Sequence, residues 1–146
     1  MNPHRALLCG MLLVAALLTA AMELQAGQDG KFDKLSPEDR KAFGERFQKE
    51  IWPLLTRNGK EGCVGCHSGG KVTALRFSGD PAKDFVMLVG DGYMLKGDAG
   101  SLLERITDKD PKRRMPPEPD KRTGWTKEEI LVLRRFVDDL DKKNKL

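Results

Sequence analysis

Apolar side chains recur with a helical period in the first half of the chain. Ser36 followed by Pro37 is typical of a helix N-cap and a first helical position. The apolar positions that follow share one helical face: Phe43, Phe47, Ile51, Leu54 and Leu55. The pattern therefore predicts a helix after Ser36, which Pro53 ends or kinks.

Two further helices are predicted from capping patterns in the second half. Ser101 with Glu104, and Thr126 with Glu129, each place an acceptor three residues before a glutamate. The apolar positions that follow are Leu102, Leu103 and Ile106 in the first helix, and Ile130, Leu133, Val137 and Leu140 in the second. Residues 107–123 between them are charged and rich in proline, which predicts a loop.

Residues 71–95 carry a weaker pattern. Apolar runs at 72–77 and 85–89 are separated by Gly79, Asp80 and Pro81, which indicate a turn. Two alternatives stay open here: a short hairpin over 72–89, or a broken helix. Taken together, the patterns predict a mainly α fold.

Length and composition favour one small domain. A chain of 146 residues fits a single domain, and 39% hydrophobic residues with 15 Gly are ordinary for a globular protein. Disorder throughout is therefore excluded. Lys and Arg number 26 against 22 Asp and Glu, and a net charge of +4 is far from that of a dedicated nucleic-acid binder. We expect no nucleic-acid partner.

The first 26 residues have the features of a secretory signal peptide. Arg5 precedes a run from Ala6 to Ala21 that holds no charge, and Ala21 and Ala26 offer cleavage sites. The run is short for a transmembrane helix, which needs about 20 apolar residues, so cleavage is favoured over anchoring. We expect a cleaved signal (1–26), a linker (27–35) and one domain (36–142) in the periplasm or another extracytoplasmic space, without a stable membrane anchor.

The cysteines and the histidine of the mature chain fall within one pentapeptide. Once the signal with Cys9 is removed, Cys63, Cys66 and His67 remain. The spacing C-x-x-C-H is the attachment signature of c-type haem, in which two thiols add to the porphyrin vinyl groups. His67 is then held toward the iron as an axial ligand. The sequence predicts one haem c, bound covalently through Cys63 and Cys66.

Three other uses of the pentapeptide remain open. A disulfide between Cys63 and Cys66 would close a very small loop and constrain the unfolded chain little. A thioredoxin-like redox pair expects a βαβ context, whereas residues 57–62 read as a polar loop. A structural zinc site needs four ligands, and the mature chain offers three. Haem c is therefore favoured.

Methionine is the remaining soft side chain for the second axial position. Met87 lies in a continuous apolar run, as is typical of a core methionine. Met115 follows two arginines and precedes two prolines, which stiffen the segment around it. We favour Met115 as the axial ligand, with Met94 or an open iron site as the alternatives.

The order of these features resembles the class I cytochrome c fold, and within it the planctomycete-type cytochrome c domain, over about residues 45–140. The matching segments are Cys63–His67, Gly97-Asp98 with Ser101, Leu102, Leu103, Arg105 and Ile106, Met115-Pro116-Pro117, and a terminal helix. The resemblance implies a small single-domain fold of three to four helices around one covalent haem. In that fold the first and last helices usually cross at a glycine and paired aromatics. Gly44, Phe47 and Phe136 are the candidates, although their spacing in the first helix departs from the common one.

Other side chains are candidates for contacts with the haem or with partners. Arg105, Arg114 and Trp125 carry N–H donors that could bind haem propionates, beside a surface role for Arg114 and a core role for Trp125. The basic excess favours acidic docking surfaces on redox partner proteins. The candidate docking charges are Lys112, Arg113, Arg114 and Lys121.

The expected function is single-electron transfer by a mono-haem c-type cytochrome, a carrier rather than an enzyme. Iron held by His67 and Met115 is saturated, and this ligand pair raises the reduction potential. The alternative is a haem-based ligand sensor or a peroxidase-like protein whose sixth iron site is open or labile. The mature chain has no second histidine to serve as a distal acid or base, which argues against peroxide cleavage.

Overall fold

The computed structural model of the chain describes residues 34–57, 62–68, 75–97, 101–116 and 124–145. The predicted signal peptide (1–26) and all but the end of the predicted linker (27–35) lie outside these residues. Of the described residues, 64% are helical and none lies in a strand, which confirms the mainly α prediction. Within the same ranges, no helix is both long and apolar enough to cross a membrane.

The first predicted helix is present and is longer than Pro53 would suggest. It runs as α2 (Pro37–Arg46), continues through a π-helical turn, η1 (Phe47–Ile51), and then becomes α3 (Trp52–Thr56). At its start, the Ser36 hydroxyl accepts from the backbone N–H of Asp39 at 3.0 Å. Pro53 has no N–H to donate and crowds the preceding turn. The wider turn just before it lets the helix pass this residue, so Pro53 changes the helix type without ending the helix.

Helix α5 (Pro81–Gly90) replaces the hairpin that residues 72–89 left open. The hairpin alternative is wrong for the described residues 75–89, since 75–78 have no regular structure and 85–89 are helical. Asp80 is the N-cap of α5, and its side chain accepts from the N–H groups of Ala82 and Lys83. Pro81 takes the first helical position, where a missing N–H costs nothing. The Gly-Asp-Pro signal therefore marks a helix start.

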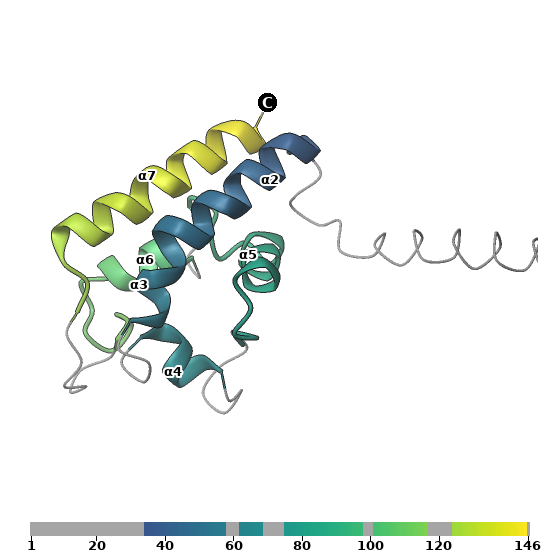
Figure 1. The fold of residues 1–146 in the computed structure, drawn as a ribbon. Helices are drawn as coiled ribbons and strands as arrows, with labels where there is room; N and C mark the ends of the chain where they lie inside the picture. Colours follow the sequence, from purple (N-terminus) through teal and green to yellow (C-terminus); the bar gives the residue numbers. More distant parts are fainter. Residues whose placement is uncertain (1–33, 58–61, 69–74, 98–100, 117–123, 146) are drawn as a thin grey trace, which may run out of the picture.

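The remaining helices include both that were predicted from capping patterns. These are α4 (Cys63–His67), α6 (Leu102–Thr107) and α7 (Lys127–Asn144). The Ser101 hydroxyl accepts from Glu104 N–H, and Thr126 and Glu129 form a reciprocal capping box. Helices α2 and α7 run side by side in opposite directions (Figure 1).

Aromatic rings join α2, η1, α5 and α7 in the core. Phe47 is fully buried, and its ring centroid lies 5.3 Å from that of Phe85 and 6.2 Å from that of Phe136. Phe43 meets Phe136 edge-on at 5.7 Å. Gly44, a candidate for the crossing of the first and last helices, instead faces α5: a Cβ added there would lie 3.6 Å from the Phe85 ring.

Candidate functional site

The pentapeptide is itself a short helix, α4, which packs against α3. In a helix, residues three and four positions apart share one face, so Cys63 presents its side chain on the same side as Cys66 and His67. The residue before α4 must be glycine. A Cβ on Gly62 would run into the Leu55 carbonyl oxygen and would lie 3.0 Å from the carbonyl carbon of Thr56.

The His67 ring is oriented by backbone groups of residues 75–77. Nδ1 lies 3.4 Å from the Leu75 carbonyl oxygen, which can only accept a hydrogen bond. A neutral imidazole that donates from Nδ1 carries its lone pair on Nε2. In addition, Phe77 N–H donates to the His67 carbonyl at 3.2 Å, and the Phe77 ring lies edge-on to the imidazole. In metal-binding histidines, a hydrogen bond from one ring nitrogen, like that from Nδ1 to the Leu75 carbonyl, fixes the tautomer that binds the metal through the other nitrogen.

Cys63 and Cys66, which are both among the described residues, are thiols and are partly buried. Across the part of the chain that the structure describes, no three His, Cys, Asp or Glu side chains gather around a common point where a metal ion could bind. Two thiols and one imidazole on one face of a five-residue helix suit a haem c, to whose porphyrin the thiols would bond and whose iron the imidazole would bind.

The half-buried apolar side chains near α4 also suit a large flat group. Cys63, Val64 and Leu75 are packed against the core but are only partly covered. The removal of apolar surface from water is favourable in free energy. The residues present therefore fit haem c in both chemistry and polarity.

The two candidate axial methionines lie in different surroundings. Met94 is fully buried in the core, and its N–H donates to the Leu88 carbonyl at 3.1 Å. Met115 is half-buried in a non-helical segment, and its N–H donates to the Arg105 carbonyl at 2.8 Å. The described contacts thus anchor Met115 to α6, while His67 is anchored to residues 75–77.

The residues that are candidates for binding haem propionates or for docking partners differ in their contacts and in their exposure. Arg105 Nη1 donates to the Arg113 carbonyl at 3.4 Å, and the Arg113 side chain pairs with Asp108 at 3.2 Å. Arg114 is half-buried. Lys112 is exposed, as a docking residue must be, whereas Lys121 lies outside the described residues. Trp125 is half-buried and packs against the core.

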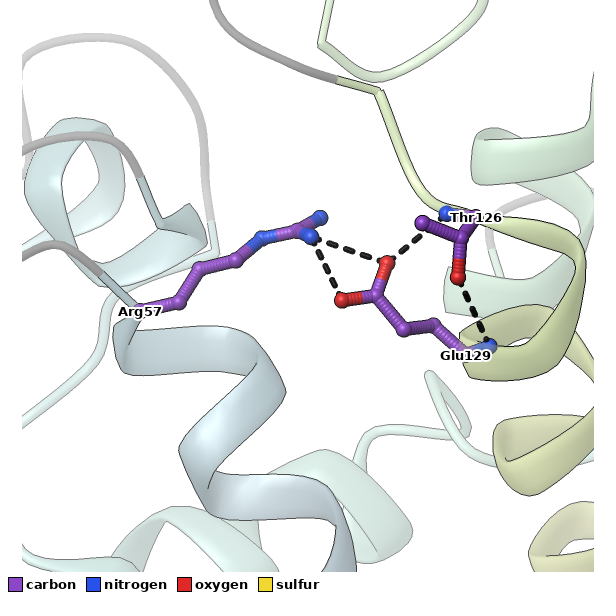
Figure 2. Close-up of polar contacts among 3 residues, drawn as sticks. All are labelled: Arg57, Thr126 and Glu129. Carbon is purple, nitrogen blue, oxygen red and sulfur yellow. Dashed lines mark hydrogen bonds and ion pairs between the residues drawn. The ribbon is translucent and has the colours of Figure 1, made fainter.

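One polar contact was not predicted from the sequence. Arg57, the residue that ends α3, forms an ion pair with Glu129 in the first turn of α7 (Figure 2). Glu129 was recognised as part of a capping box, but its partner lies 72 residues earlier in the chain. A pairing over that separation leaves no local pattern.

Comparisons with known proteins find no matching protein-family model, no matching curated protein and no matching solved structure. The residues of this chain that bear on its function are the two thiols and the imidazole of α4, the Leu75 carbonyl beside the His67 ring, and the half-buried segment that holds Met115.

Proposed function

We propose that this chain is an extracytoplasmic mono-haem c-type cytochrome that transfers single electrons between redox partners. One observation carries the proposal. Cys63, Cys66 and His67 share one face of α4, and the Leu75 carbonyl accepts from Nδ1 of His67. This arrangement suits two thioether bonds on one porphyrin edge and an iron bond to Nε2.

Each residue of α4 and its neighbours would have a separate task. Cys63 and Cys66 would hold the haem covalently, and His67 would bind its iron. Gly62 lets α4 lie against the end of α3, where any side chain would strike the Leu55 carbonyl. The partly covered apolar residues near α4 would exclude water from the haem. When bound, the haem iron would cycle between ferric and ferrous and so carry one electron.

Met115 is the proposed sixth ligand. Met94 is fully buried in a close-packed core, where its side chain already fills space among other residues. Met115 is half-buried, and its backbone is held by the Arg105 carbonyl. Because the Met115 side chain is still partly exposed, it can bind a haem iron without opening the core. A His67 and Met115 pair leaves no iron position for a substrate, which suits an electron carrier better than an enzyme.

The proposed partners are redox proteins with acidic docking surfaces. Lys112 and Arg113 are exposed on the segment that leads to Met115, and Arg114 is half-buried beside them. Positive charge next to the ligand segment would steer an acidic partner toward it. The extracytoplasmic location rests on the signal-like residues 1–26 and on haem attachment itself.

Covalent attachment tests the proposal directly. The full chain is produced in a host with haem c maturation machinery, and the denatured protein is examined by intact mass and haem staining. We expect one haem that survives denaturation. A variant with Cys63→Ser and Cys66→Ser should retain no covalent haem, because both thioether bonds are lost. Ser68→Ala, at the exposed residue directly after α4, is the matched control and should keep the haem.

A folded wild-type chain without haem would contradict the proposal. So would covalent haem on the double cysteine variant, since attachment would then not depend on the pentapeptide.

A further inference from the structure

Arg57 makes three contacts with the start of α7. Its Nη1 donates to both carboxylate oxygens of Glu129, at 2.7 and 2.8 Å (Figure 2). Its guanidinium also lies 5.4 Å from the centre of the Trp125 ring. The side chains of Arg57 and Glu129 are about one-fifth exposed, at 21% and 22%. Water therefore screens this pair less than a surface pair, and a charge-assisted hydrogen bond is stronger there.

Glu129 is also held in place by hydrogen bonds that do not involve Arg57. Its carboxylate also accepts from Thr126 N–H at 2.7 Å, and its own N–H donates to the Thr126 hydroxyl at 3.2 Å. A carboxylate in the first turn of a helix is further stabilised by the helix dipole. Arg57 thus binds an acceptor that is already fixed.

The contact lies between the end of α3 and the start of α7, which are the described elements next in sequence to the two segments that carry the proposed iron ligands. Arg57 is the last described residue before Gly62 and α4, so it stands where the chain leaves α3 toward Cys63–His67. Trp125 stands where the chain that comes from Met115 enters α7. At its other end, the Met115 segment is held by the Arg105 carbonyl of α6, and α6 packs against α7.

We propose that Arg57 is a positioning residue for Met115: through Glu129 and Trp125 it fixes the entry of α7 against the end of α3, and so would keep the Met115 segment in position to ligate the iron of a bound haem. This inference rests on the proposed function. Without the contact, the Met115 segment keeps its tie to α6 but loses the tie between α7 and the segment that leads into α4. Met115 then leaves the iron more often.

Arg46 provides a matched control within the same molecule. It also lies on the first helix, pairs with an acid of α7 (Asp139, 2.6 Å), and stacks on an aromatic ring of α7 (Phe136, 5.4 Å). Burial lowers the pKa of Arg46, but hydrogen bonds to Asp139 and Glu50 outweigh this and leave the pKa raised, so the guanidinium stays charged. Asp139 is ten residues beyond Glu129, about 15 Å farther along α7. Arg46 therefore ties the same helices together away from the Met115 segment.

The test measures how readily imidazole displaces Met115 from the ferric haem-loaded protein, followed by absorbance. The apparent affinity of such a probe scales with the fraction of molecules whose iron site is open. For Arg57→Met we expect imidazole to bind about tenfold more tightly than to the wild type, a change equivalent to about 1.4 kcal/mol. Arg57→Lys keeps a cation near Glu129, so its affinity for imidazole should lie between those of the wild type and Arg57→Met. Arg46→Met should stay within about twofold of the wild type, although both arginine variants lower the unfolding free energy.

A second readout does not depend on an added ligand. Hydrogen exchange at the Met115 amide, which donates to the Arg105 carbonyl, should become faster in Arg57→Met than in Arg46→Met. If Arg57→Met does not accumulate with haem, Glu129→Gln removes the same charge pair from the other side and carries the same expectation.

Equal imidazole affinities in the two arginine variants would overturn the inference, because Arg57 would then be a stability residue only. An imidazole affinity of Arg57→Met equal to that of the wild type would overturn the inference too. These results differ from a failure of the proposed function. A wild-type chain without covalent haem removes both ideas, and a wild type that binds imidazole as readily as Met115→Ala removes Met115 as the ligand and this role of Arg57 with it.

Discussion

The orientation of His67 depends on a backbone carbonyl and not on another side chain. Because the acceptor is the carbonyl of Leu75, substitution of the Leu75 side chain leaves the acceptor in the chain. With Nδ1 facing this carbonyl, Nε2 is the ring nitrogen left to bind a metal. At the scale of single residues, Leu75 and Phe77 are therefore as much a part of the candidate site as the pentapeptide.

Gly62 is the residue beside α4 that tolerates substitution least. In Gly62→Ala, the new Cβ meets the backbone of Leu55 and Thr56, which cannot rotate away as a flexible side chain would. We expect the unfolding free energy to fall by about 1–3 kcal/mol, the usual range for overpacking. Denaturant unfolding of the full chain measures it.

Gly44→Ala is the control for this prediction. A Cβ there would lie in ordinary contact with the Phe85 ring at 3.6 Å, and alanine favours a helix over glycine. Its unfolding free energy should stay within about 1 kcal/mol of the wild type. Equal losses in the two variants would show that the close approach of α4 to α3 is not rigid.

Residue-level prediction from the sequence is possible where the signal is local. Cys63, Cys66 and His67 are predicted as a site because all three lie within five positions, and Met115 is favoured as a ligand because of its charged and proline-rich neighbours. Arg57 was missed because its partner is 72 residues away. Its contacts depend on how the helices pack, which no short window of sequence contains.

Helix α5 shows how the same residues can signal either a turn or a helix start. Gly79 has a positive φ of 87°, as turn residues often have, and Asp80 and Pro81 are equally common in turns and at helix N-termini. The apolar run that follows was compatible with a buried strand or a buried helix segment. Tertiary contacts decide between them, and among these contacts are those of the Phe85 ring with the rings of Phe47 and Phe136.

Asp84 should be the most sensitive polar residue of α5. It is 1% exposed, and its two carboxylate oxygens accept from the N–H groups of Ser78 at 2.7 Å and Gly79 at 3.1 Å. Asp84→Ala removes both acceptors and should lower the unfolding free energy by about 3–6 kcal/mol, because each of the two hydrogen bonds to the charged carboxylate contributes about 1.5–3 kcal/mol. The measurement is chemical denaturation of the full chain.

Asp80→Ala is the comparison for this variant. Asp80→Ala removes a solvent-exposed N-cap, and the loss of an N-cap usually lowers the unfolding free energy by about 1 kcal/mol. The account of α5 fails if Asp84→Ala is no more damaging than Asp80→Ala.

At the scale of the whole molecule, α2, η1, α5 and α7 share a core of aromatic rings, in which Phe43, Phe47, Phe85 and Phe136 meet. Helix α4 contacts α3 at the end of the first helix (Figure 1). The mainly α fold could be predicted because apolar positions repeat at helical spacing around Ser36 and Thr126. The π turn before Pro53 could not, since it depends on how one helix accommodates a missing N–H while keeping Phe47 and Ile51 buried.

The central claim is that the chain carries a haem c whose iron is closed by His67 and Met115. The most direct measurement is the optical spectrum of the purified, haem-loaded protein in the oxidised state, in the reduced state, and in the reduced state with carbon monoxide. Met115→Ala and Met94→Ala are measured beside the wild type. A closed iron cannot take up carbon monoxide, whereas an iron that lacks its sixth ligand can.

We predict a low-spin wild-type spectrum that carbon monoxide leaves unchanged, a Met115→Ala variant that binds carbon monoxide, and a Met94→Ala variant that does not. A wild type that is high-spin or takes up carbon monoxide would contradict the account and would favour a ligand sensor or a peroxidase-like protein.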